Sequence, residues 1–593
     1  MNKRNVSLAT SAIQELGFRC FRSVAQRKLV YEVLACKRSV TGVLPTGLGK
    51  TLAIFVGLTD KKPGLTLVVY PLRSVYDDAV KRFKQVSIQT PKFKGAWKTW
   101  NPSGSVGLFE GTKVVLVTAE QARSKLFLEQ VKESEGSIRR VIFDEAPVFV
   151  TSSFRLGLSS LPLCLRASLS CPFVLLTGTL RRNQEEELRR RFLCPGMRVI
   201  RGPTVRPEVA HKVVRISRDN VTAADVAKFV SLTPDVLTIV FVKTIDEVKK
   251  LATGLESEVA FRGKTVLYHG SLSGEERKVA AHSWKSVQKP IMIATTAFAY
   301  GIHSDKCRRI IHVEGAYDVD TYVQAAGRAG RDGRHAVSIT LFGQKSFLSK
   351  DFSSFVTKKA CRLVTLSSMF DSNTLQWEKS CGACDWCKSA GLVGHIVPLD
   401  WRIRKYTVHK PDKDLSPLQE RCAASKYLAQ VKSSLRRILF FCREQFCFTC
   451  FVLSRGRQKL FHGINACPHW RGRCFRCGSN CRRQNCVNQR VINKKLTEAS
   501  LCVTCAMPSF IFDTNVHHGQ FSMGRGCSYR DKVLPAMLVL WRVGSGKKDL
   551  EESAHRPLST LESFLDWAVE ETQGVPNLIH FLVVYLKSKT CET

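Results

Sequence analysis

Acidic residues are scarce in this sequence. The 593-residue chain has 50 Asp and Glu residues against 91 Lys and Arg residues, so its formal net charge is 91 − 50 = +41. An excess of this size is too large to be an accident of surface composition, and it favours a polyanionic partner.

Long apolar runs, internal repeats and low-complexity tracts are also missing. The longest apolar runs, such as Phe581 to Leu586, are far shorter than the ~20 residues that span a bilayer. The first residues lack the apolar core of a signal peptide, so we expect an intracellular protein with no membrane partner. Apolar residues still make up 44% of the chain, which argues against global disorder and suits about four structural units.

Cysteine is sparse in the front half of the chain and abundant in the back half. Of the 23 cysteines, 17 lie in the last 233 residues, from Cys361 onward. In a reducing compartment, repeated cysteine pairs are more often metal ligands or free thiols than disulfides.

Short apolar runs alternate with helix-compatible stretches between Val40 and about Ser338, and the series is interrupted near 201–235. Runs of this kind are typical of strands buried on both faces of a parallel sheet. We therefore expect two α/β domains, at 1–200 and 201–350, then a helical zinc-binding subdomain, a linker and a Cys-rich region. Their expected bounds are 351–395, 396–420 and 421–593. The expected strands are Leu65 to Tyr70, Val114 to Thr118, Val141 to Phe143, Phe173 to Thr177, Leu237 to Phe241, Thr265 to Tyr268, Ile291 to Ala294, Ile310 to His312 and Val337 to Phe342.

A glycine-containing loop, Leu44-Pro-Thr-Gly-Leu-Gly-Lys-Thr51, lies between an apolar stretch and a helix-compatible one. Gly47 and Gly49 allow backbone N–H groups to turn toward phosphate oxygens at a helix N-terminus, where the helix dipole favours an anion. Lys50 would reach the β and γ phosphates and Thr51 would hold magnesium, with Thr46 completing the nucleotide-binding loop.

Two further polar elements predict the rest of a phosphoryl-transfer site. Asp144 and Glu145 follow a buried strand, so Asp144 would complete the magnesium site and Glu145 would orient or deprotonate the attacking water. In the second domain, the segment from Gln324 to Gly333 carries Arg328 and Arg331. Because they are three residues apart, both can face the cleft between the domains and neutralise charge on the transferring phosphoryl group.

With these elements in order, the chain from about Leu16 to Cys387 resembles superfamily 2 helicases, and within them the RecQ family of DNA helicases. The resemblance implies that Gln26 reads adenine and that Gln324 acts in catalysis with Lys50, the two acids and the two arginines. It implies nucleic-acid contacts by Thr118, Phe149, Phe154, Arg155 and Thr295. Its other motifs are Phe21-Arg22, Val69 to Ser74, Val117 to Gln121, Leu176 to Thr179, Ile239 to Phe241, Tyr268 to Gly270 and Ala294 to Phe298.

What the family implies is a pair of RecA-like domains that use ATP and Mg²⁺ to move 3′ to 5′ on single-stranded DNA and separate the duplex ahead. Two domains that close on ATP and open after hydrolysis can ratchet a strand between them. A DNA substrate in turn implies a nuclear location.

Three departures from the family pattern leave other functions open. Pro147 stands where the family usually has His, the aromatic loop at 148–155 is shorter and lacks Trp, and Ala299 to His303 replaces a glycine and an acidic residue. Phe149 and Phe154 are the remaining candidates for stacking on bases. The alternatives are a zinc-stabilised nucleic-acid-binding protein whose motor has decayed, and an ATPase that DNA stimulates without unwinding.

Cysteine spacing predicts structural zinc. Cys361 with Cys381, Cys384 and Cys387 supplies four thiolates, which is the tetrahedral ligand set, and the order matches the RecQ zinc subdomain.

The cysteines further along the chain allow several metal sites. Cys447, Cys450, His462 and Cys467 could form one site; Cys474 and Cys477 could form another with Cys481 and Cys486 or with Cys502 and Cys505. This region resembles the Cys-rich tails of fungal telomere-linked RecQ-like helicases. Arginines and an aromatic residue among these cysteines favour nucleic-acid binding, although a zinc module with a solvated basic face fits equally well. They are Arg471, Arg473, Phe475, Arg476, Arg482 and Arg483.

Overall fold

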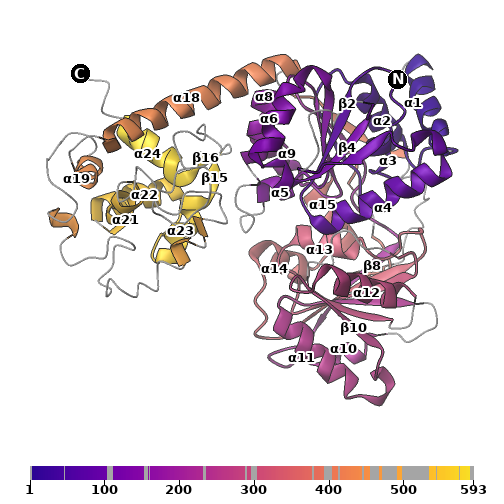
Figure 1. The fold of residues 1–593 in the computed structure, drawn as a ribbon. Helices are drawn as coiled ribbons and strands as arrows, with labels where there is room; N and C mark the ends of the chain where they lie inside the picture. The colour runs from indigo at the N-terminus through magenta and orange to yellow at the C-terminus, as the bar shows by residue number, and fades with distance from the viewer. Residues whose placement is uncertain are drawn as a thin grey trace.

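The computed structural model describes two parallel β-sheet domains and a helical C-terminal module that lies at the far end of a long helix, α18 (Pro417–Arg443) (Figure 1). The expected fold class, two tandem RecA-like domains, is confirmed. The described residues are 3–45, 47–102, 111–151, 158, 160–230, 236–286, 290–295, 304–376, 380–392, 404–411, 415–443, 447–454, 467–470, 491–493, 495–496, 533–542, 544–572 and 575–587.

The first domain is built on an eight-stranded sheet of order β14-β7-β1-β6-β5-β2-β4-β3, parallel except where β14 joins β7. Its central strands are apolar and buried along most of their length, as continuous Val, Ile and Leu runs require when both faces are covered. The strands are β1 (Val40–Val43), β2 (Leu65–Tyr70), β3 (Trp97–Thr99), β4 (Val114–Thr118), β5 (Ile138–Phe143), β6 (Phe173–Thr177), β7 (Arg198–Arg201) and β14 (Thr407–His409).

Helices cover both faces of this sheet, so alternate residues of one strand enter different cores. In β2, Val68 packs in one buried cluster and Val69 in the other. On one side lie α1 (Lys3–Glu15), α2 (Val24–Ala35), α3 (Leu52–Phe55) and α4 (Arg73–Gln89). On the other lie α5 (Ala119–Ala122), α6 (Lys125–Glu133), α8 (Ser160–Ser168) and α9 (Glu185–Arg191).

The second domain has a six-stranded parallel sheet of order β10-β11-β9-β12-β13-β8. Five strands coincide with expected runs: β9 (Leu237–Phe241), β10 (Thr265–Tyr268), β11 (Ile291–Ala294), β12 (Cys307–Val313) and β13 (Ala336–Phe342). The sixth, β8 (Val209–Arg215), lies in the stretch that the sequence pattern treats as an interruption. It is an edge strand whose last four residues, from Lys212 on, are partly or fully exposed. His211 is buried, and its Nδ1 lies 2.7 Å from the Tyr322 hydroxyl, which provides a polar partner inside the core.

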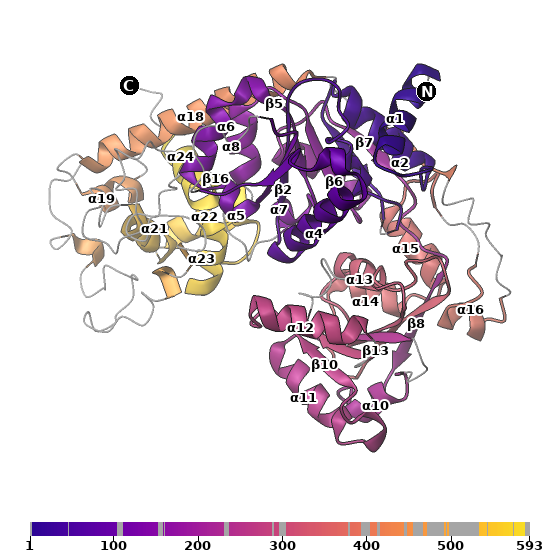
Figure 2. The ribbon, with the colours of Figure 1, turned by 45° about the vertical axis from the view of Figure 1, so that its right-hand side comes forward.

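Three short helices follow the second sheet and lie against it: α14 (Lys350–Thr357), α15 (Arg362–Phe370) and α16 (Asp385–Ser389). Figure 2 shows α15 between the two sheet domains, with α16 beside β8. The expected linker at 396–420 is not only a connection, because it contributes β14 to the first sheet and the start of α18.

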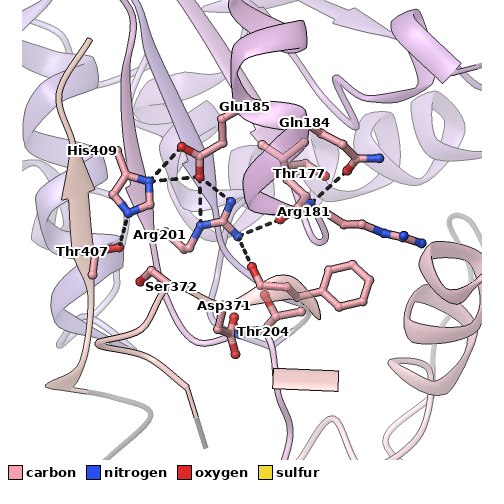
Figure 3. A network of polar contacts seen from close by, with 12 residues as sticks. Thr177, Arg181, Gln184, Glu185, Arg201, Thr204, Asp371, Ser372, Thr407 and His409 are labelled. Carbon is pink, nitrogen blue, oxygen red and sulfur yellow. Dashed lines mark hydrogen bonds and ion pairs between the residues drawn. The ribbon is translucent and has the colours of Figure 1, made fainter. Parts of the chain in front are cut away.

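A buried arginine of the first sheet connects it to α15 and, through Glu185, to β14. Arg201, at the end of β7, is fully buried and bonds through Nη2 to Glu185 Oε1 at 2.6 Å. Its Nη1 donates to the carbonyl oxygens of Leu180 (2.7 Å) and Phe370 (3.1 Å), while His409 Nδ1 of β14 lies 2.8 Å from Glu185 Oε2 (Figure 3). One ion pair therefore links β7, α9, α15 and β14.

The first residues of α18 are inserted into the first domain. The Glu420 side chain is buried; its Oε2 accepts from Ser39 Oγ at 2.9 Å and its Oε1 from the Gly196 amide at 3.2 Å. Arg166 Nη2 lies 3.6 Å from the same carboxylate. A Cβ on Gly196 would lie 2.4 Å from the Leu415 carbonyl oxygen, so the backbones pack closely here.

The C-terminal module has its own apolar core, centred on Trp541, Phe564 and Trp567. Its helices are α19 (Phe448–Leu453), α21 (Val533–Arg542), α22 (Gly544–Ala554), α23 (Leu561–Val569) and α24 (Asn577–Lys587), with a short ribbon of β15 (Glu571–Thr572) and β16 (Val575–Pro576). Across the part of the chain that the structure describes, no helix has both the length and the apolar character to cross a bilayer.

The buried contacts of Glu420 predict how strongly the start of α18 stabilises the first domain. Replacing Glu420 with Ala leaves the buried guanidinium of Arg166 without this carboxylate, and breaking a buried pair in this way costs about 3 kcal/mol. We expect Glu420→Ala to lower the calorimetric unfolding temperature of the first domain by several degrees. Glu129→Ala, which removes an exposed i,i+4 pair with Lys125, should shift it little. Equal shifts for the two variants would contradict the anchoring role.

Candidate active site between the two sheets

Three adjacent strands of the first sheet end at one place. β1 pairs with β6, with Val43 opposite Thr177, and β6 pairs with β5, with Leu175 opposite Phe143. The loop at 44–51, the acidic pair and the segment after Thr177 therefore share the carboxyl edge of the sheet, where ligands of open α/β sheets bind.

The phosphate loop depends on glycine. Gly47 and Gly49 have φ values of +91° and +81°, which favour glycine. A Cβ on Gly49 would lie 2.2 Å from Gln26 Nε2, which donates to the Gly49 carbonyl at 2.9 Å. Arg22 Nη1 donates to the Gly47 carbonyl at 3.2 Å, so the segment ahead of the loop holds it in shape. Thr46, the other predicted loop residue, lies outside the described residues.

Lys50 and Glu145 form an ion pair in this structure, with Lys50 Nζ 2.9 Å from Glu145 Oε1. Burial acts to raise the pKa of Glu145, but Lys50 and then Arg328 outweigh it and hold that pKa below its ordinary value. The second oxygen, Glu145 Oε2, is buried and has no hydrogen-bond partner among the described residues. A buried carboxylate oxygen without a protein donor suits a water molecule or the hydration shell of a cation.

The Asp144 carboxyl suits a metal ligand. Burial, and then the adjacent Glu145 carboxylate, raises the pKa of Asp144 to about 6. Two partly buried carboxylates side by side are a concentration of negative charge that a divalent cation would relieve. Thr51 begins α3, and its Oγ1 accepts from Arg82 Nη1 at 3.4 Å, while Arg82 also lowers the pKa of Asp144. Asp144 and Thr51 thus fit the pair of magnesium ligands expected from the sequence.

The second domain faces this edge with α13 (Val319–Ala326) and the turn that follows it. Gln324 Nε2 donates to Thr179 Oγ1 of the first domain at 3.1 Å. Arg328 is buried, and its charge lowers the pKa of Glu145. The structure therefore brings Gln324 and Arg328 to the acidic pair, as the sequence predicts. Both line a cleft with residues of each domain: Pro45, Glu145, Gly178, Thr179, Arg206 and Gly327 among them.

Arg331 lies in the same positive region, within reach of the phosphate loop. A Cβ on Gly47 would lie 3.8 Å from the Arg331 carbonyl oxygen. Burial lowers the pKa of Arg331 well below its ordinary value, and three neighbouring guanidinium groups lower it further, those of Arg328, Arg206 and Arg82. Four guanidinium groups gathered beside a phosphate loop create a strongly anion-attracting wall.

Two of these arginines are absent from the sequence prediction. Arg82 lies on α4 and pairs with Asp78 at 2.7 Å. Arg206 precedes β8 and donates to the carbonyl oxygens of Gly327 (3.0 Å) and Gly330 (2.6 Å), which fixes the arginine-bearing turn. Neither stands in a recognisable motif, so only the tertiary structure reveals them.

A third missed residue, Arg181, bridges the domains. Its Nη2 lies 2.5 Å from Asp320 Oδ2 of α13 and 2.5 Å from Asp351 Oδ2 of α14. The guanidinium carbon lies 5.6 Å from the centre of the Phe370 ring of α15. Arg181 of the first domain therefore forms ion pairs with both α13 and α14.

The predicted nucleic-acid contacts are met only in part. Phe149, in α7 (Val148–Thr151), is 1% exposed and packs edge-on against Phe143, so the expectation that its ring stacks on bases is wrong for this structure. Thr118 ends β4 and Thr295 follows β11; both are buried. Phe154 and Arg155 lie outside the described residues.

Four cysteines meet between α15 and α16. The Sγ atoms of Cys361, Cys381, Cys384 and Cys387 lie within 4.8 Å of one another. Backbone amides of Cys381, Cys384 and Cys387 donate to sulfur at 3.3–3.4 Å, which favours thiolates. The Cys381 and Cys387 sulfurs are 3.9 Å apart, close to the about 3.8 Å edge of a tetrahedron with zinc–sulfur bonds of about 2.3 Å. The cluster has the geometry of a closed, structural metal site.

Comparison with protein-family models agrees with this geometry. A DEAD/DEAH box helicase model matches residues 23–187, and a helicase conserved C-terminal domain model matches residues 223–333. The first matched segment lies within the first sheet domain and the second within the second sheet domain.

The curated proteins to which this chain is similar are named as helicases of DNA and of RNA. A putative ATP-dependent DNA helicase Q1 of Caenorhabditis briggsae is 26% identical over 382 residues, covering 59% of this chain and 59% of its own length. The ATP-dependent DNA helicase RecQ of Bacillus subtilis is 24% identical, covering 57% and 56%. The mouse ATP-dependent RNA helicase DDX42 is 26% identical, covering 52% of this chain and 34% of its own length. The chain thus spans three fifths or less of these relatives.

Among solved structures, the helicase Lhr of Mycobacterium smegmatis bound to ssDNA and AMP-PNP is 21% identical and has a TM-score of 0.47. The match covers 61% of this chain and 49% of that one.

The loop geometry predicts the effect of a single methyl group on nucleotide binding. Gly49→Ala places a Cβ against Gln26 in a left-handed backbone conformation, which costs about 1–2 kcal/mol before the contact is counted. We expect it to weaken binding of a fluorescent ATP analogue at least tenfold. Gly136→Ala, at a site with nothing within 4 Å of the new Cβ, is the control and should bind as the unmodified chain does. Tight binding by Gly49→Ala would show that the loop does not hold phosphate.

Proposed function

We propose that the protein is an ATP-dependent DNA helicase that moves on single-stranded DNA and separates duplexes. The observation that carries the proposal is the cleft in which Glu145 of the first domain faces Arg328 of the second, beside a glycine-dependent phosphate loop. A site divided between two domains opens and closes as nucleotide binds and leaves. Such closure is how ATP hydrolysis is coupled to movement along a strand.

In the proposed reaction, Lys50 moves from Glu145 to the β and γ phosphates of ATP. The ion pair of this structure holds the lysine in the cleft, 2.9 Å from the carboxylate, and a triphosphate would replace that carboxylate as its partner. Once released, Glu145 can orient the attacking water and accept its proton. Burial away from bulk water strengthens each of these interactions.

Magnesium would be held by Thr51 and Asp144, where it supplies Lewis-acid neutralisation of phosphate charge. Arg328 and Arg331 then act from the opposite wall. Their guanidinium groups donate to the phosphoryl oxygens as charge moves to the leaving group. Gln324, bonded to Thr179 Oγ1, aligns the second domain with the first.

DNA is favoured over RNA as the substrate by one structural feature. The four-cysteine cluster directly behind the second sheet, at Cys361, Cys381, Cys384 and Cys387, has the order and position that the RecQ resemblance implies. We propose in addition that this cluster binds zinc. The same proposal includes movement in the 3′ to 5′ direction and a nuclear site of action. The net charge of +41 suits either nucleic acid.

A second candidate function is an ATPase that nucleic acid stimulates without strand separation. Burial of Phe149 favours it, because the loop that follows the acidic pair then offers one fewer aromatic ring to a base. Pro147, in place of the family's His, removes a polar link at the same point.

Substitutions in the cleft should separate binding from chemistry. We expect Lys50→Ala to abolish ATP hydrolysis stimulated by single-stranded DNA. We expect Arg331→Ala to lower kcat by about 10³-fold or more, because an arginine at the transferring phosphoryl group contributes that much. Arg334→Ala removes a largely exposed side chain of the same turn and serves as the control. Hydrolysis by Lys50→Ala at the unmodified rate would refute the proposed site.

Strand displacement decides between the two candidate functions and between the two substrates. Duplexes with a 3′ or a 5′ single-stranded tail, made of DNA or of RNA, are incubated with the protein and Mg²⁺, with and without ATP. We expect ATP-dependent release from the 3′-tailed DNA duplex. Stimulated hydrolysis with no release from any duplex would support the ATPase, and preference for RNA tails would overturn the DNA assignment.

A further inference from the structure

A second group of cysteines lies in the C-terminal module, far from the nucleotide cleft. The Sγ atoms of Cys447, Cys450 and Cys467 lie within 4.8 Å of one another, and those of Cys450 and Cys467 are 3.7 Å apart. All three side chains are buried. Cys447 and Cys450 come from the start of α19, whereas Cys467 lies 17 residues beyond Cys450, just before a 3₁₀ turn at Pro468–Trp470.

The local geometry of α19 repeats that of the first cysteine cluster. Cys384 is the N-cap of α16 and Cys387 lies in its first turn; Cys447 is the N-cap of α19 and Cys450 lies in its first turn. In both places a Cys-x2-Cys pair therefore spans the first turn of a short helix, which brings its two sulfurs together. The backbone amide of His469 bonds to the Cys467 sulfur, as amides do within the first cluster.

The sulfur separations do not fit a disulfide. A disulfide needs sulfurs about 2.05 Å apart and would leave the third thiol unused, whereas the Cys450 and Cys467 sulfurs are 3.7 Å apart. The separation instead matches the about 3.8 Å edge of a tetrahedral zinc–thiolate site.

We propose that Cys447, Cys450 and Cys467 bind a structural zinc ion and supply three of its four ligands. The inference rests on this cluster alone and does not depend on the proposed helicase activity. The ion would join α19 to the 3₁₀ turn at Pro468–Trp470, next to Val539 of α21, which packs against the same cysteines. It would therefore fix the position of Cys467 relative to α19, a few residues ahead of the arginine-rich sequence that begins at Arg471.

Metal counting on the full chain tests the proposal. Zinc per chain is measured for the unmodified protein and for Cys450→Ser, Cys467→Ser, Cys384→Ser and the double variant Cys450→Ser with Cys384→Ser. We expect each single variant to lose one zinc and the double variant to lose two. Cys422→Ser, at an exposed cysteine, should lose none. Unchanged zinc content in both Cys450→Ser and Cys467→Ser would overturn the site.

A measurement on the unmodified chain covers the case in which a variant fails to fold. Cysteines are alkylated before and after treatment with a zinc chelator, and the modified positions are located by mass spectrometry. We expect Cys447, Cys450 and Cys467 to become reactive only after chelation, while exposed Cys422 reacts throughout. If the three cysteines react at the same rate with and without the chelator, they do not bind zinc.

Discussion

Attraction between opposite charges across the interdomain cleft is the constraint on which the rest of the structure depends. The first sheet presents partly buried carboxylates at Asp144 and Glu145, and the second presents Arg328 and Arg331. Burial raises the pKa of Asp144 to about 6 and drives that of Arg331 down, so each side of the cleft holds charge that an opposite charge would stabilise. In the proposed function, a triphosphate with its magnesium would supply opposite charge to both sides and draw the two domains together.

Contacts outside the cleft hold the acidic pair of the first domain in position opposite the arginines of the second. Arg181 reaches from the first domain to Asp320 on α13, the helix that also carries Gln324, and to Asp351 on α14. Arg201 reaches the Phe370 carbonyl at the end of α15 while it remains paired with Glu185. The cysteine-bearing helices behind the second sheet are thus connected to the first sheet by two arginines, and a change in the cleft angle must be accommodated at these same side chains.

Much of the fold follows from the sequence because buried parallel strands are continuous apolar runs; Leu65 to Tyr70 is an example whose expected and observed bounds agree. Strands that carry polar residues, such as β7, β8 and β14, are not found from apolar runs. β7 begins and ends with arginine, and Arg201 is buried only because Glu185 neutralises it, which no pattern along the chain reveals. Lys50 and Glu145 follow from local motifs, whereas Arg82 and Arg206 enter the site from elements without a motif. The expectation for Phe149 is wrong because an aromatic residue after an acidic pair can turn into the core as easily as toward a ligand.

Helix α18 makes the C-terminal module an extension of the first domain. With 27 residues it is about 40 Å long, and its first turn is held in the first domain by Glu420 on Ser39 and Gly196 (Figure 1). Because a long helix is stiff and α18 is fixed at its first turn, its far end moves together with the first domain. Any rotation of the first domain relative to the second would therefore displace the distal module farther than it displaces residues near the cleft.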